Sequence, residues 1–134
     1  SNLDPHQSPL FWKSVNSLQL FSETKNNLLR AVVPPANCEK VMNNIKNKFK
    51  YFIDWSGSLF WIEVPGKDDD KLKEVKKMIL QNNGYLTIIK KSEEFDFSEK
   101  IFTIDDTKLM ISKKIKESFD PKGIFNPGKM YKDF

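Results

Sequence analysis

The alternation of strand-like and helix-like apolar patterns over residues 28–90 restricts the fold of this chain more than any other feature. Four short segments rich in β-branched, aromatic and other apolar residues are predicted as strands: residues 28–33, 51–54, 59–64 and 85–89. Apolar residues at spacings of three and four predict one helix after the first strand and another after the third. The order β-α-β-β-α-β is typical of the ferredoxin-like, or split βαβ, fold of the α+β class. Right-handed crossovers then predict an antiparallel sheet with both helices on one face.

The ends of these segments carry residues that interrupt strands and helices. Pro34–Pro35 cannot continue a strand ladder, and Asn37 is predicted to cap the helix that follows. Three aspartates at residues 68–70 suit the positive end of the second helix. Asn83–Gly84 is predicted to end that helix in the left-handed conformation.

Three regions follow from this order. Residues 1–27 form an N-terminal arm, residues 28–90 the ferredoxin-like core, and residues 91–134 a loop, a helix and a turn-rich tail. Two prolines in the arm predict an irregular segment with at most one helical turn, followed by a short strand at residues 18–21.

A third helix is predicted in the C-terminal region. Asp105 or Asp106 is suited to cap it, and Asp120, which precedes a proline, is expected to end it. Lysines mark its solvent side, and its inward side is predicted from the apolar spacing: Leu109, Ile111, Ile115 and Phe119.

The predicted sheet has two apolar faces, because side chains alternate along a strand. Leu29, Ala31 and Val33 are assigned to the helices, since the small Ala31 allows close packing. The other face carries Arg30 with four apolar neighbours: Leu28, Val32, Leu59 and Trp61. Such a patch is expected to be covered, either by the third helix and the arm or, as we favour, by another domain.

Arg30 requires an anion if it is partly buried. Glu63 on the same face is one candidate, and a substrate carboxylate bound by the guanidinium fork is the other. Trp55 and Trp61 are expected to pack in the core or an interface rather than stack on a cofactor. Asp54 is expected to cap the hairpin connection at residues 55–58 rather than contact substrate.

Charge and composition narrow the classes of function. The net charge of +4 is small and spread over helix faces, so nucleic-acid binding is not expected. An RNA-binding sheet would also need aromatic residues in the first strand, which is aliphatic here. One histidine, His6, and one cysteine, Cys38, exclude a His/Cys metal site in this sequence, and no apolar stretch is long enough to span a membrane.

Two reverse turns follow one another in the tail. Residues 120–123 (DPKG) have the type I signature, and residues 126–129 (NPGK) have proline then glycine at the centre, as in type II. Together they predict a rigid C-terminal structure around the apolar pair Ile124–Phe125. Turn chemistry alone does not distinguish a tail that packs on its own domain from one that packs on a partner.

The tail sequence FDPKGIFNPGKMY resembles the closing motif of FAD-linked oxidases that have the vanillyl-alcohol-oxidase type of flavin domain. LLRAVVPP and YFIDWSGSLFWIE resemble, in the same order, segments of the E subunit of bacterial glycolate oxidase (glycolate dehydrogenase). The resemblance extends over residues 28–131. It implies the C-terminal cap of a subunit whose N-terminal FAD-binding domain is absent from this chain, which begins without methionine and is expected to be a fragment.

The resemblance also implies roles for individual residues. Asn126, Gly128 and Lys129 would lie against the flavin, and Arg30 would face the pocket of a small 2-hydroxyacid. The sequence has no Gly-rich phosphate loop, no metal-binding set and no evident general base. We therefore assign no catalytic residue or metal ligand, and expect the fragment to be inactive and to hold no FAD by itself.

The implied partners are the chain's own FAD domain, a related flavin subunit that is the better candidate for the chemistry, and an iron–sulfur subunit that takes electrons. The implied location is cytoplasmic, with peripheral attachment to the inner membrane through the complex as an option. The alternative is a stand-alone ferredoxin-like module that binds a small molecule or a protein, since this fold serves many functions.

Overall fold

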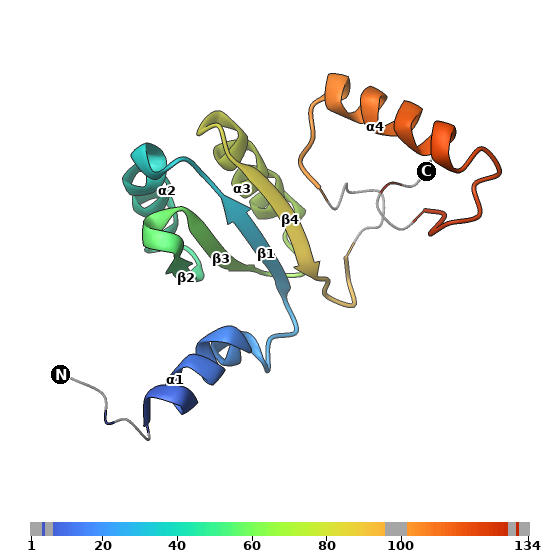
Figure 1. Ribbon diagram of the computed structural model, residues 1–134. Coiled ribbons are helices and arrows are strands. Elements are labelled where there is room, and N and C mark those ends of the chain that lie inside the picture. The colour runs from blue at the N-terminus through green and yellow to red at the C-terminus, as the bar shows by residue number, and fades with distance from the viewer. Residues whose placement is uncertain (1–3, 5–6, 96–101, 129–130, 132–134) are drawn as a thin grey trace.

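A four-stranded antiparallel sheet lies at the centre of the protein, in the order β2-β3-β1-β4 (Figure 1). The computed structural model describes residues 4, 7–95, 102–128 and 131. Its strands are β1 Asn27–Val32, β2 Lys50–Asp54, β3 Leu59–Val64 and β4 Tyr85–Lys90. Sheet order and direction are those of the ferredoxin-like α+β fold, which confirms the prediction.

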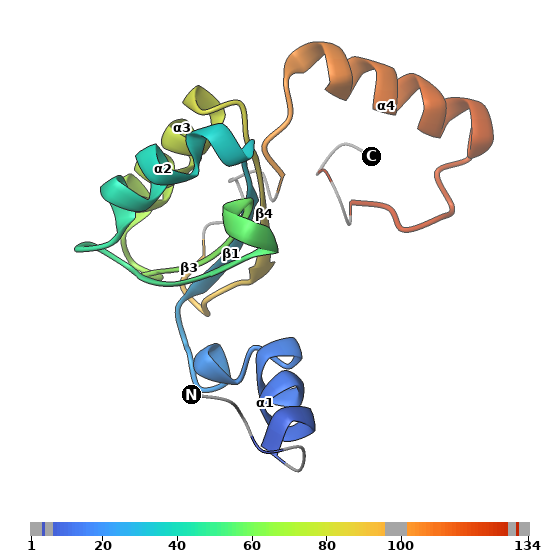
Figure 2. The ribbon, with the colours of Figure 1, turned by 60° about the vertical axis from the view of Figure 1, so that its left-hand side comes forward.

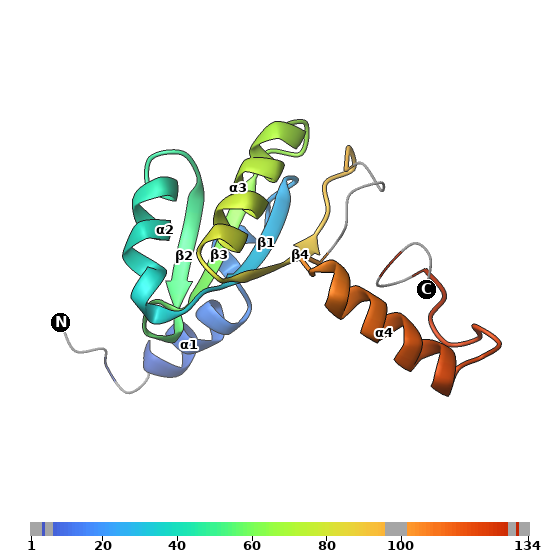
Figure 3. The same ribbon diagram turned by 90° about the horizontal axis from the view of Figure 1, so that it is seen from above.

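Two helices, α2 (Cys38–Ile45) and α3 (Asp69–Gln81), cover one face of this sheet (Figure 3). The side chains of Leu29, Ala31 and Val33 are at most 2% exposed and belong to the core beneath the helices, as predicted. The same core contains the side chains on one face of β3 and on the apolar sides of α2 and α3. From β3 these are Phe60, Ile62 and Val64, and from the helices they are Val41, Ile45, Leu72, Val75 and Ile79. Burial of these apolar side chains is the main stabilising contribution to such a layer.

Side chains at the helix ends fix how the helices begin and end. The Lys71 ammonium lies 2.8 Å from the Asp68 carboxylate, which also accepts a hydrogen bond from the backbone N–H of Lys71 at 2.9 Å, and these two contacts lower the pKa of Asp68. Asn37 occupies the predicted position before α2, but its side chain makes no cap there. Its Nδ2 instead donates to the carbonyl oxygen of Asn82 at 2.9 Å, which ties the start of α2 to the end of α3.

The N-terminal arm differs from the prediction. It forms a helix, α1 (Gln7–Asn16), followed by a short 3-10 turn, η1 (Gln19–Phe21), where we expected an irregular segment and a strand. Pro9 lies in the first turn of α1, where its missing N–H costs no intrahelical hydrogen bond. Leu18 adopts a left-handed conformation, with φ of 52°, which a strand does not accommodate.

The third predicted helix is α4 (Asp106–Phe119), which is capped by the Asp105 carboxylate through the N–H of Lys108 at 2.9 Å. The prediction that its apolar side points inward is wrong for Ile111, Ile115 and Phe119, which are 49%, 53% and 85% exposed. α4 lies beyond the β4 edge and away from both faces of the sheet (Figures 1 and 2). It therefore does not cover the sheet face opposite α2 and α3, which we call the open face.

The segment that carries α4 leaves the sheet and returns to the same place. Phe102 forms a bridge with Thr87 of β4, and the N–H of Thr103 donates to the carbonyl oxygen of Leu86 at 2.9 Å. After α4 and the tail turns, the ring of Tyr131 lies 5.9 Å from the ring of Phe102, centroid to centroid. Residues 102–131 thus form an excursion whose two ends meet beside β4.

Gly84 offers a test of the close packing between α3 and β1. Asn83 takes the left-handed conformation at the end of α3, with φ of 56°, and Gly84 allows close approach. In Gly84→Ala, the added Cβ would lie 2.6 Å from Cγ1 of Val33 and 2.7 Å from the carbonyl oxygen of Val32. We expect the free energy of unfolding in urea to fall by about 1–3 kcal/mol.

Gln81→Ala is the control for this prediction, because Gln81 is exposed on the last turn of α3. We expect its free energy of unfolding to stay within about 0.5 kcal/mol of that of the parent protein. Equal stability of the Gly84→Ala and Gln81→Ala variants would contradict the packing account.

Candidate functional site

Arg30 lies at the centre of the open face. Its partners across the sheet are Trp61 on β3 and Thr87 on β4, and Phe52 on β2 is paired with Trp61. Directly opposed residues of antiparallel strands project to the same face, so these four side chains form one row across the sheet. All four are half-buried.

The open face is covered in part by the arm. Phe21 of η1 is 2% exposed, and the Lys50 ammonium lies 5.2 Å from the centroid of its ring. Leu28 and Leu59 of this face are themselves only 5% and 3% exposed. The expectation that the arm folds over this face is therefore correct in part, whereas α4 takes no part in the cover.

Arg30 contacts an aromatic ring rather than a carboxylate. Its guanidinium carbon lies 5.1 Å from the centroid of the Trp55 ring, a cation–π contact. Glu63, which we considered as a partner, accepts a hydrogen bond from Nδ2 of Asn26 at 2.7 Å and lies 3.9 Å from the Lys50 ammonium. Among the described residues, Arg30 has no carboxylate partner, so its N–H donors are available to a ligand.

The turn that carries Trp55 is η3 (Trp55–Gly57), which joins β2 to β3. Its three residues all have positive φ, 51° at Trp55, 53° at Ser56 and 94° at Gly57. The Asp54 carboxylate accepts a hydrogen bond from the N–H of Trp55 at 2.7 Å, which confirms Asp54 as the cap of this connection. A left-handed backbone at a residue as large as Trp is unusual and marks local strain.

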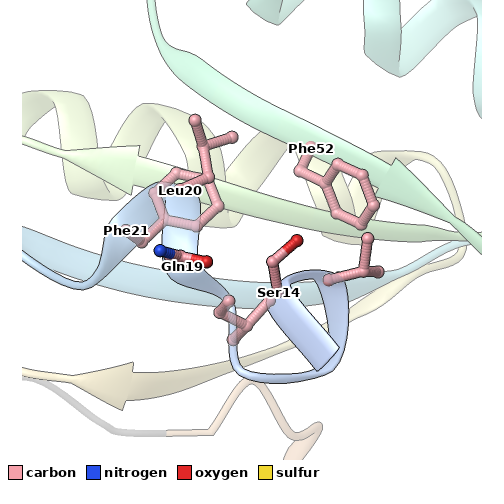
Figure 4. Close-up of a pocket in the computed structure, with 7 residues that line it drawn as sticks. Ser14, Gln19, Leu20, Phe21 and Phe52 are labelled. Carbon is pink, nitrogen blue, oxygen red and sulfur yellow. The ribbon is translucent and has the colours of Figure 1, made fainter. Parts of the chain in front are cut away.

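A hollow of about 410 Å³ lies between the arm and β2 (Figure 4). Its lining is mostly apolar: Ser14, Val15, Leu18, Gln19, Leu20, Phe21 and Phe52. None of the predicted site residues lines this hollow. It has no charged side chain with which to fix a ligand, so we do not assign it as the site.

The tail turns form a compact structure, the hook (residues 120–128), around the carboxylate of Asp120. The N–H groups of Ile124 and Phe125 donate to its two oxygens at 2.9 and 2.8 Å. Lys116 donates to the same carboxylate and to the carbonyl oxygen of Phe125. A 3.0 Å hydrogen bond from the N–H of Gly123 to the carbonyl oxygen of Asp120 closes the first predicted turn.

The hook presents its apolar side chains to solvent. Ile124 and Phe125 are 66% and 68% exposed, whereas Asp120, which organises them, is 8% exposed. Gly128 has φ of 67°, as the third position of a type II turn requires, and Asn126 also has positive φ, 49°. Both are exposed. Lys129, the third predicted flavin contact, lies outside the described residues.

Residues 98–130, which include the whole of α4 and of the hook, match the family model described as "FAD linked oxidases, C-terminal domain". This match supports a C-terminal domain of an FAD-linked oxidase. It covers roughly a quarter of the chain and leaves the ferredoxin-like core outside it. Comparisons with curated proteins and with solved structures gave no match.

The matched family implies an FAD cofactor in its full-length proteins, and two of the three residues predicted to contact it are among the described ones. Asn126 offers an amide, and Gly128 offers a backbone that a ring can approach closely. No hydrogen bond, ion pair or ring contact among the described residues joins Arg30 to Asn126 or Gly128. The two groups of predicted site residues are therefore separate, and a flavin site would need further walls.

In the described part of the chain, no group of three or more His, Cys, Asp or Glu side chains is arranged to hold a metal ion. None of the described helices has the length and apolar character that crossing a bilayer requires.

The hook is expected to open at low pH. The hydrogen bond from Lys116, followed by those from the N–H groups of Ile124 and Phe125, lowers the pKa of Asp120 from 3.8 to about 2. A carboxylate with a depressed folded-state pKa stabilises the fold above its ordinary pKa, and this contribution is lost as the pH falls toward 2. Amide chemical shifts of Ile124 and Phe125, followed by NMR between pH 5 and pH 1, should show that transition.

Two lysine variants test the cause of this shift. Lys116→Gln should move the midpoint of the transition upward toward 3.8, because the largest contribution to the low pKa is removed. Lys114→Gln, at an exposed position of the same helix, should leave the midpoint unchanged. A midpoint near 3.8 in the parent protein would show that Asp120 does not organise the hook.

Proposed function

We propose that this chain is the cap domain of an FAD-dependent 2-hydroxyacid oxidoreductase subunit of the glycolate-oxidase type. The observation that carries the proposal is the family match over residues 98–130, which coincides with the excursion that leaves its apolar side chains uncovered. The cap would cover the flavin and shape the substrate pocket. The resemblance of residues 28–64 to a glycolate oxidase subunit supports the substrate class.

The uncovered side chains of the excursion suit an interface with the chain's own FAD domain. Six of them are between 49% and 85% exposed: Met110, Ile111, Ile115, Phe119, Ile124 and Phe125. A soluble domain seldom leaves so many large apolar groups in water. A flavin domain packed there would bury them and bring the hook to the cofactor.

In this arrangement Asn126, Gly128 and Lys129 lie against the flavin. When bound, FAD would supply the acceptor for the hydride removed from the hydroxyacid. The protein groups would hold and orient the ring system and exclude water from it. We assign no catalytic acid or base to this chain.

Arg30 is proposed to bind the substrate carboxylate. Its guanidinium has no carboxylate partner among the described residues, and the half-buried side chain contacts the Trp55 ring and belongs to a residue paired with Trp61 across the sheet. A charge-assisted fork to a carboxylate is stronger in such a setting than in open water. The related flavin subunit and an iron–sulfur subunit complete the proposed complex, in the cytoplasm or at the inner membrane.

Arg30→Ala in the protein that includes the FAD domain should lower kcat/KM for the hydroxyacid by about 10- to 100-fold, because a charged hydrogen-bond donor is lost. The measurement is steady-state oxidation of glycolate and lactate with an artificial electron acceptor. Lys77→Ala, at an exposed position on α3, is the matched control and should leave kcat/KM unchanged. Equal turnover and equal flavin content in Arg30→Ala would count against this role.

Lys129→Ala should loosen FAD, because a cation beside the cofactor is removed. Flavin content after extended dialysis, measured from the visible spectrum, is expected to fall. Lys122→Ala, an exposed lysine of the first tail turn, should retain its flavin. Full retention by both variants would remove Lys129 from the site.

The alternative is a stand-alone ferredoxin-like binding module. It is favoured by the sheet and its two helices, which form a buried core within residues 29–95 without any contribution from α4 or the hook. Such a module would remain colourless when expressed from its complete coding region and would be monodisperse. A visible flavin spectrum from the complete protein would decide against it.

A further inference from the structure

The cations of the open face differ in their partners. Lys50 donates to the carbonyl oxygen of Leu20 at 2.6 Å and lies near Glu63, and Lys90, the β4 partner of Leu28, donates to the carbonyl oxygen of Thr24. Among the described residues, the guanidinium of Arg30 makes no hydrogen bond or ion pair, and its cation–π contact is with the Trp55 ring. One cation with available donors therefore stands at the centre of this face.

The contact with Trp55 leaves the guanidinium donors of Arg30 without a hydrogen-bond partner among the described residues. A guanidinium carries five N–H donors in a fixed fork, and a carboxylate takes two of them. A carboxylate can therefore bind to donors that no other group of the described residues engages. The contact also restricts the long side chain of Arg30 before any ligand arrives, which lowers the entropic cost of binding.

Contacts of the turn with α2 and β1 hold Trp55 at this position. Gly57 lies so close to Cys38 that an added Cβ would be 2.7 Å from its Sγ, and the N–H of Val33 donates to the carbonyl oxygen of Ser58 at 2.9 Å. These contacts fix a backbone that a tryptophan rarely adopts. Trp55 is nevertheless 55% exposed, so core packing does not explain its place in the turn.

The residues around Arg30 determine which substituents a carboxylic acid bound there can have. Trp61 and Val32 provide apolar surface, and Thr87, directly across from Arg30 on β4, provides a hydroxyl with no hydrogen-bond partner among the described residues. A monocarboxylate with an apolar substituent and a 2-hydroxyl group matches these surroundings. A second carboxylate would have to compete with the oxygens that Lys50 and Lys90 already contact, and Glu63 beside Lys50 would repel it.

We infer that Trp55 is a positioning residue that holds Arg30 in place to bind small 2-hydroxy monocarboxylates with an apolar substituent, in preference to dicarboxylates. This inference deepens the proposed function and rests on it for the reaction that the bound acid undergoes. The binding itself needs no flavin and can be measured on the 134-residue chain.

The test is an NMR titration of this chain with 2-hydroxy-4-methylpentanoate and, separately, with malate. The side-chain N–H signal of Arg30 and the indole N–H signal of Trp55 report binding at the site. Trp55→Asn removes the ring but keeps a residue that tolerates the left-handed turn. We expect its affinity for the monocarboxylate to fall about three- to thirty-fold, while its unfolding midpoint in urea stays equal or rises.

Two further variants separate positioning from folding. Trp55→Phe retains a ring and should recover part of the affinity. Trp12→Asn removes a tryptophan of α1 that is 57% exposed, close to the 55% of Trp55, and should bind as the parent chain does.

Failure of the parent chain to bind the monocarboxylate, equal affinity in Trp55→Asn, or equal binding of malate would overturn the inference. A colourless complete protein would instead overturn the flavin assignment and leave the titration result standing.

Discussion

The register of β1 against β3 and β4 is the constraint on which the rest of the structure depends. It directs Leu29 and Ala31 under the helices and Arg30 to the other side. A slip of one residue would exchange the two sets and bring a guanidinium into an apolar core, where it would have no anion. The position of Arg30 is therefore enforced by the packing of its neighbours and does not depend on contacts of its own.

Much of the core could be predicted from the sequence because its periodicity is strict. β3 has the predicted bounds, β2 and β4 are each one residue longer than predicted, and β1 is shifted by one residue toward the N-terminus. The short apolar alternations and the proline and glycine breaks were sufficient for this part. The prediction of an irregular arm is wrong because proline breaks a helix only in its interior, whereas Pro9 lies in the first turn, where proline is tolerated.

The orientation of α4 could not be predicted from its pattern. An apolar stripe shows that a helix has a side to bury, but not which surface buries it. Ile111, Ile115 and Phe119 have the spacing of a core helix, and yet they are exposed. Similarly, the tail motif indicated two turns around Ile124–Phe125, but not that the carboxylate of Asp120 would hold both backbone N–H groups.

In the candidate site, too, the sequence predicts the contacts between neighbouring residues but not those between residues far apart in the chain. Arg30 could be singled out because a lone charge in an apolar strand face is unusual. Its contact with Trp55 could not, because the two residues are brought together by a hairpin turn whose positive φ angles have no strong sequence signal except Gly57. Asp54 was correctly expected to cap that turn, since its role depends only on the next residue.

The excursion over residues 102–131 has a consequence for how such domains diversify. Because Phe102 and Tyr131 meet beside β4, the intervening chain enters and leaves the sheet at one point. A segment attached in this way can be lengthened, shortened or replaced in evolution without disturbing the pairing of the strands. The surface that contacts a partner can then change independently of the fold of the sheet.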